Sequence, residues 1–96
     1  MLRISVHEGA NQVVLELEGR LAGAWVMELE ECWRQTSSRL ANESVSLKLD
    51  AVHHVDSSGK YLLALLRYKG VKLTGSGMAV TDLIRGIEEE WPVNGQ

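Results

Sequence analysis

The chain has 96 residues, of which 45% are hydrophobic and 24% charged, the balance typical of one small globular domain with a single core. This length excludes a multidomain enzyme, and this composition excludes a disordered polar tail. Ten basic and thirteen acidic side chains give a net charge of −3, and because the basic residues form no cluster we expect no nucleic-acid partner.

The first part of the sequence predicts a β-hairpin. Apolar and polar residues alternate over residues 2–6 and again over 12–19, which is the pattern of half-buried strands. Turn-forming residues at 8–11 separate the two segments. Because this connection is short, we expect the two strands to pair in antiparallel fashion.

The pattern changes to a helical period from Ala24 to about Leu40. Most large apolar side chains of this segment fall on one helical face, and its charged side chains lie largely opposite. We expect this face to pack against the core, with both tryptophans contributing core volume. The face consists of Trp25, Val26, Leu29, Cys32, Trp33 and Leu40.

The second half predicts two further strand and helix pairs. Residues 44–50 alternate as a strand, and a loop with His53 and His54 is expected before a helix that begins near Asp56 and ends at Gly70. A brief strand over 71–74 precedes an amphipathic helix whose apolar residues recur at helical spacing. Those residues are Val80, Leu83, Ile84, Ile87 and Trp91.

The element order is therefore β-β-α-β-α-β-α, an α/β fold. Strands joined by helices should run parallel through right-handed crossovers. The prediction is a small mixed β-sheet with helices packed on it, forming a single domain over residues 1–96.

Three features that the sequence does not contain predict the cellular compartment of the protein. Its one cysteine, Cys32, has no second cysteine in the chain to pair with, which fits a reducing environment. No apolar run of about 18 residues is present, so no membrane insertion is expected. The first residues do not have the pattern of a signal peptide. We expect a cytoplasmic protein.

The segment Asp56-Ser57-Ser58-Gly59 is the strongest candidate for a functional site. It lies where a strand gives way to a helix, and free backbone N–H groups and the helix dipole favour negative charge there. One interpretation is simple N-capping by Asp56 or Ser57. The other is a serine that carries a regulatory phosphate, which adds about −1.5 to −2 charges to a docking surface.

The same residues resemble the signature of STAS domains, the anti-sigma factor antagonist family. The resemblance is carried by residues 47–59, LKLDAVHHVDSSG, with Leu49, Val52 and Val55 as the apolar anchors of the strand and loop. Residues 17–21 resemble the earlier strand end of the family with its glycine, and residues 72–91 resemble its later strand and helix. In element order the resemblance spans residues 2–91.

The resemblance implies a protein-binding signalling module and not an enzyme, and it implies no cofactor. The serine directly after the aspartate, here Ser57, is the phosphorylation site in this family. The partner is an anti-sigma factor that is also a serine kinase, and it binds only the unphosphorylated form. By position, Asp56, Ser57, Ser58 and Gly59 form the partner-binding site, with Gly59 allowing close approach.

The resemblance also implies an alternative function. The segment from Gly59 to Gly70 is shorter than in typical members of the family. A short STAS protein can instead be an unphosphorylated subunit of an ABC lipid transporter, docked on its ATPase subunit, or of another multiprotein complex. The sequence identifies neither the partner nor the oligomeric state.

Four weaker patterns are also present. His53 and His54 could be metal ligands, but adjacent side chains of an extended chain point apart, and we expect no metal. Gly75-Ser76-Gly77 could cradle a phosphate or be an ordinary turn. Cys32 could be a nucleophile or a core residue. Ser57, His54 and Asp56 have the composition of a catalytic triad, although neighbours in one loop rarely achieve its geometry.

Overall fold

A computed structural model describes residues 1–92 of the chain. The elements are β1 (Leu2–Glu8), β2 (Val13–Leu21), α1 (Ala24–Ser37), a 3-10 turn (Asn42–Ser44), β3 (Val45–Val55), α2 (Ser57–Tyr68), β4 (Lys72–Thr74) and α3 (Met78–Glu90). The small mixed α/β fold expected from the sequence is confirmed.

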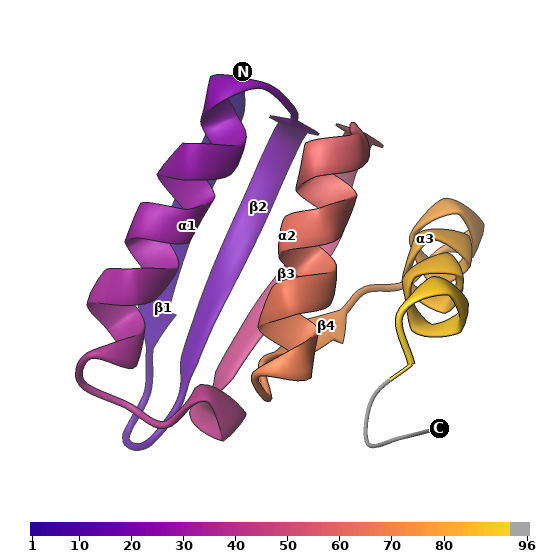
Figure 1. Ribbon diagram of the computed structural model, residues 1–96. Helices are drawn as coiled ribbons and strands as arrows, with labels where there is room; N and C mark the ends of the chain where they lie inside the picture. The colour runs from indigo at the N-terminus through magenta and orange to yellow at the C-terminus, as the bar shows by residue number, and fades with distance from the viewer. Residues whose placement is uncertain (93–96) are drawn as a thin grey trace.

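The four strands form one sheet in the order β1-β2-β3-β4. β1 and β2 are the expected antiparallel hairpin, and β3 runs parallel to both β2 and β4. Helices α1 and α2 lie side by side over one face of this sheet, and α3 lies beyond β4 (Figure 1).

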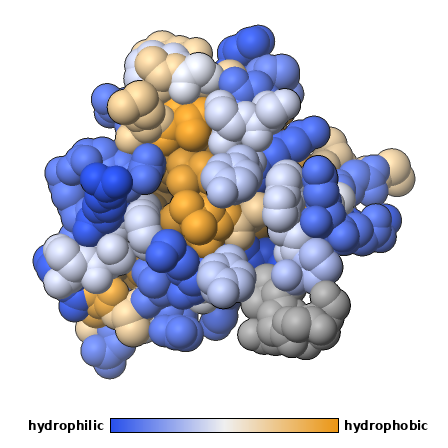
Figure 2. Space-filling view, viewed as in Figure 1, coloured by the Kyte–Doolittle hydropathy of each residue, from blue (hydrophilic) through white to orange (hydrophobic). Residues whose placement is uncertain are grey.

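The core lies between the sheet and its helical layer. Alternate residues of the two central strands, among them Leu15 and Leu47, are fully buried there, because successive side chains of a strand point to opposite faces. Leu29 of α1, Leu63 of α2 and Ile87 of α3 pack against them. Apolar side chains are also visible along the line where α1 and α2 meet (Figure 2).

Two sequence predictions need correction. Residues 51–55 are not a loop, because β3 continues to Val55 and pairs there with the end of β2. The second correction concerns Trp25, which lies in the first turn of α1 and is 38% exposed, whereas Trp33 is half-buried and donates a hydrogen bond to Asn42 Oδ1. Trp25 therefore contributes less to the core than expected.

Within residues 1–92, no helix combines the length and apolar character that crossing a membrane requires.

Candidate functional site

The candidate site lies at the carboxyl ends of the parallel strands β2 and β3. Leu21 ends β2 and pairs with Val55, the last residue of β3. The Asp56 N–H then donates to the Leu21 carbonyl oxygen at 3.2 Å. Helices α1 and α2 both begin at this end of the sheet (Figure 1). The ends of β2 and β3 and the starts of α1 and α2 therefore converge around Asp56.

Asp56 is the N-cap of α2 and also joins the two helices. Its Oδ1 accepts hydrogen bonds from the Gly59 N–H and the Ser58 hydroxyl, both at 2.8 Å. Its Oδ2 accepts one from the N–H of Gly23, directly before α1, at 3.0 Å. The capping prediction is therefore confirmed for Asp56. Gly23 was not among the predicted site residues, and its signal in the sequence is a glycine directly before a helix. Its φ of 60° favours glycine.

These contacts keep the Asp56 carboxylate ionised. The hydrogen bond from Gly23 lowers the pKa of Asp56 most, followed by those from Gly59 and Ser58, and the charge of His54 adds to the effect. Each of these groups favours the charged form. The candidate site therefore has a fixed negative charge beside Ser57.

The lowered pKa predicts a specific dependence of stability on pH. A carboxyl group with a depressed folded-state pKa stabilises the fold above its ordinary value of 3.8, and the contribution is lost as the pH falls through the folded-state pKa. We expect the wild-type chain to be more stable than Asp56→Asn near neutral pH and to lose this advantage in acid. Urea unfolding at about pH 7 and about pH 3 tests this, and an advantage independent of pH would contradict it.

Ser57 and Ser58 are both exposed, but their environments differ. The Ser58 hydroxyl donates to Asp56 Oδ1, so it is part of the cap. Ser57 is the first residue of α2, where backbone N–H groups have no partner within the helix. Of the two hydroxyls, that of Ser57 is therefore the one not used by the capping network.

Gly59 is buried under the site, unlike its two serine neighbours. A Cβ atom at this position would lie 2.6 Å from the Leu21 carbonyl oxygen and 2.8 Å from Val55 Cγ1. The absence of a side chain at Gly59 therefore lets α2 pack closely against the ends of the two strands. Gly59 positions the site and does not itself form part of the exposed surface.

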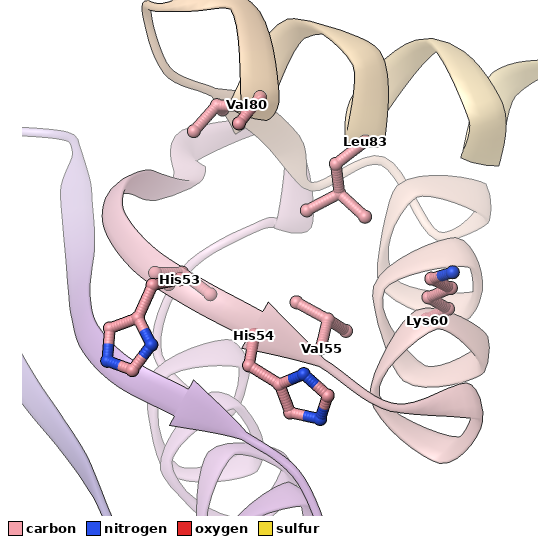
Figure 3. Close-up of a pocket in the computed structure, with 8 residues that line it drawn as sticks. His53, His54, Val55, Lys60, Val80 and Leu83 are labelled. Atoms are coloured by element: carbon pink, nitrogen blue, oxygen red, sulfur yellow. The ribbon is translucent and has the colours of Figure 1, made fainter.

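Residues 56–59 form a corner between β3 and α2. A small pocket lies beside this corner, between the end of β3, α2 and α3 (Figure 3). Its polar lining comes from His53, His54 and Lys60. Leu83 of α3 points toward Val55 on the opposite side (Figure 3). Of these three side chains, His54 is the one whose charge acts on the carboxylate of Asp56.

The geometry does not favour the catalytic interpretations. Within residues 1–92, no hydrogen bond joins His54 to Ser57 or Asp56, because the Asp56 oxygens bind Gly23, Ser58 and Gly59. A nucleophile, base and orienting acid need such contacts. Burial raises the pKa of the Cys32 thiol, which is the opposite of what a nucleophilic cysteine requires.

The phosphate-cradle interpretation of residues 75–77 also lacks support. The Ser76 N–H donates to Asp50 Oδ1 at 2.6 Å. A carboxylate therefore occupies the donor that a phosphate would need, and it would repel the phosphate. As for metal ions, no group of three or more histidine, cysteine, aspartate or glutamate side chains with suitable geometry exists among the described residues.

An exposed aromatic surface continues from the corner along α2. Tyr61 and Tyr68 are 61% and 69% exposed, and they follow Ser57 at the spacing of one helical face. Leu65 and Trp91 line the groove between them, and the rings of Tyr61 and Trp91 meet edge to face. These tyrosines were not among the predicted site residues, although their helical spacing from Ser57 is visible in the sequence.

Comparison with solved structures identifies the fold. An anti-sigma factor antagonist from Mycobacterium paratuberculosis matches with a TM-score of 0.75 and 16% identity over 100% of this chain and 87% of that one. An uncharacterised protein from Shewanella loihica with a SpoIIAA-like fold matches with a TM-score of 0.60 and 10% identity over 97% of this chain and 82% of that one. The chain therefore has a STAS-like fold.

The fold also occurs inside a larger chain. The structure of a protein named Mglu matches with a TM-score of 0.59 and 20% identity, over 77% of this chain but only 19% of that chain. No family model matches the sequence, and no curated protein matches it. The likeness to known proteins is thus one of fold, and it agrees with the STAS resemblance of residues 47–59.

Proposed function

We propose that this chain is a bacterial, cytoplasmic signalling module that binds an anti-sigma factor with serine kinase activity and is switched by phosphorylation of Ser57. The observation that supports it most is the position of Ser57. Its side chain is exposed at the first residue of α2, in a segment that resembles the STAS signature. The fold is shared with an anti-sigma factor antagonist.

Electrostatics explain how such a switch operates without unfolding the domain. A phosphate adds about −1.5 to −2 charges, and the N-terminus of a helix tolerates negative charge. The carboxylate of Asp56 next to it is already ionised. Phosphorylation therefore changes this corner from a single carboxylate with a free hydroxyl into a strongly anionic surface, which a partner that fits the neutral serine cannot accommodate.

Two substitutions at Ser57 test the switch. Ser57→Ala should retain the partner and Ser57→Asp should lose it, because only the second adds charge at the docking surface. Thr81→Asp is a matched control, since Thr81 is an exposed residue in the first turn of α3. Each variant is immobilised and exposed to extract of the host cell, and the captured proteins are compared by mass spectrometry.

We expect a protein with a kinase domain to be captured by the wild type, Ser57→Ala and Thr81→Asp, but not by Ser57→Asp. Equal capture by all four proteins would contradict the switch. Capture of transporter ATPase subunits would favour the alternative function, an unphosphorylated STAS subunit of an ABC transporter.

A further inference from the structure

The two edges of the sheet differ in protection. β4, at one edge, has only three residues and lies next to α3 (Figure 1). β1, at the other edge, has seven residues, LRISVHE. It contains no proline or lysine, which are features that commonly block pairing at an edge strand, and its register with β2 is continuous, without a bulge.

Two hydrogen bonds show which backbone groups of β1 face the free edge. The Arg20 N–H donates to the Met1 carbonyl at one end of the hairpin, and the Gly9 N–H donates to the Gln12 carbonyl at the other. Both bonds follow the β1–β2 register. Because hydrogen-bonded pairs alternate along an antiparallel ladder, odd-numbered residues bind β2 and the even-numbered ones, residues 2, 4, 6 and 8, face outward.

The backbone groups of residues 2, 4 and 6 face the free edge. Their side chains lie on one face of the sheet and form an apolar row that is incompletely covered. Ile4 is half-buried and Val6 is 45% exposed, whereas their cross-strand neighbours Leu17 and Leu15 are fully buried. Helix α1 lies in front of β1 (Figure 1) but leaves Ile4 and Val6 incompletely covered. Free backbone groups and uncovered apolar side chains therefore coincide on β1.

We propose that β1 pairs in antiparallel fashion with β1 of a second copy of this chain, with the two-fold axis at Ile4. Ile4 then faces Ile4 of the second copy, and Leu2 faces Val6 of the second copy. The pairing continues the apolar row of both sheets and satisfies the outward backbone groups of residues 2, 4 and 6.

The charges of β1 and β2 select this register over its neighbours. Arg3 faces the uncharged Ser5 of the second copy. Its own cross-strand neighbour Glu18 lies on its other side, and the second copy's Glu16 lies beyond that Ser5, so no like charges oppose each other across the junction. A shift in one direction places Glu8 against Leu2 or Ile4. A shift in the other direction places two Arg3 side chains opposite each other, which is unfavourable.

Helix α1 lies in front of β1 (Figure 1). Pairing through β1 therefore brings the α1 helices of the two copies to neighbouring positions across the junction. Ser57 begins α2 directly after β3, which β2 separates from β1, so one dimer presents two candidate sites.

Association in solution tests the proposal. Sedimentation equilibrium from about 1 µM to about 500 µM should show a reversible monomer–dimer equilibrium, as expected for a small interface. Val6→Lys should raise the dissociation constant at least tenfold (about 1.4 kcal/mol), because it places a charge against Leu2 of the second copy. Val6→Thr, a β-branched control that keeps the backbone donor, should change it much less.

Disulfide trapping tests the register itself. In a Cys32→Ala background, Ile4→Cys places two thiols opposite each other with Cα atoms about 5.5 Å apart, within disulfide range. Val6→Cys places them more than about 13 Å apart. We expect trapping of Ile4→Cys dimers only. A monomer at all concentrations, a dimer unaffected by Val6→Lys, or trapping through Val6→Cys and not Ile4→Cys would overturn the proposal.

Discussion

Replacing Gly59 with alanine is expected to lower the free energy of unfolding by about 2–3 kcal/mol, the cost of inserting a methyl group into a tightly packed contact. The added Cβ would lie 2.6 Å from the Leu21 carbonyl oxygen and 2.8 Å from Val55 Cγ1. Neither atom can move freely, because Leu21 and Val55 pair with each other in the sheet. α2 must therefore shift away from the sheet and weaken the packing of its buried leucines.

Gly86→Ala is the matched control for this substitution. Gly86 also lies within a helix, but an added Cβ there meets no atom within 4 Å. Alanine should therefore stabilise α3 by up to about 1 kcal/mol, because it favours the helix over the unfolded chain. Thermal unfolding should show a melting temperature lowered by roughly 10–20 °C for Gly59→Ala and slightly raised for Gly86→Ala. A similar small change for both variants would contradict the packing assigned to Gly59.

Tyr61→Ala is expected to weaken binding of the proposed partner by at least about 30-fold, which corresponds to a hot-spot residue. Tyr61 lies one helical turn after Ser57 on the same face of α2, and the residue is 61% exposed in the isolated chain. A tyrosine buried on binding contributes a large contact area at a low cost in conformational entropy. Because most of the side chain is exposed before binding, its loss should affect stability mainly through the edge-to-face contact with Trp91.

The effect of Tyr61→Ala is measured by titrating the captured partner against the purified variant. Met78→Ala serves as the control, since Met78 is 82% exposed but lies at the start of α3. We expect the wild type and Met78→Ala to bind alike. Unchanged affinity of Tyr61→Ala would place the docking surface elsewhere than along α2.

Local sequence patterns predicted most of the fold because they report local structure. Alternation over residues 12–19 and 44–50 gave the central strands, and Gly70, with a φ of 110°, ends α2 as expected. The pattern failed at His53 and His54, whose polarity suggested a loop. They are strand residues because the end of β3 pairs with the end of β2, and this pairing depends on residues far away in the sequence.

The same distinction applies to the candidate site. The motif identified Asp56 as a cap because the Gly59 N–H it binds is only three residues away. The hydrogen bond from Gly23 joins residues 33 positions apart, and the contact of Gly59 with Leu21 also depends on how α2 packs against β2. No local pattern encodes such contacts, so the link between the two helices became apparent only in the structure.

The central claim is that Ser57 carries a regulatory phosphate, and it is tested most directly on the chain purified from its own host under several growth conditions. Intact-mass spectrometry followed by phosphopeptide mapping distinguishes Ser57 from Ser58. We predict a single phosphate on Ser57 whose occupancy changes with conditions, with Ser58 unmodified because its hydroxyl caps α2 through Asp56. No phosphate under any condition, or phosphate on Ser58 alone, would contradict the proposed switch.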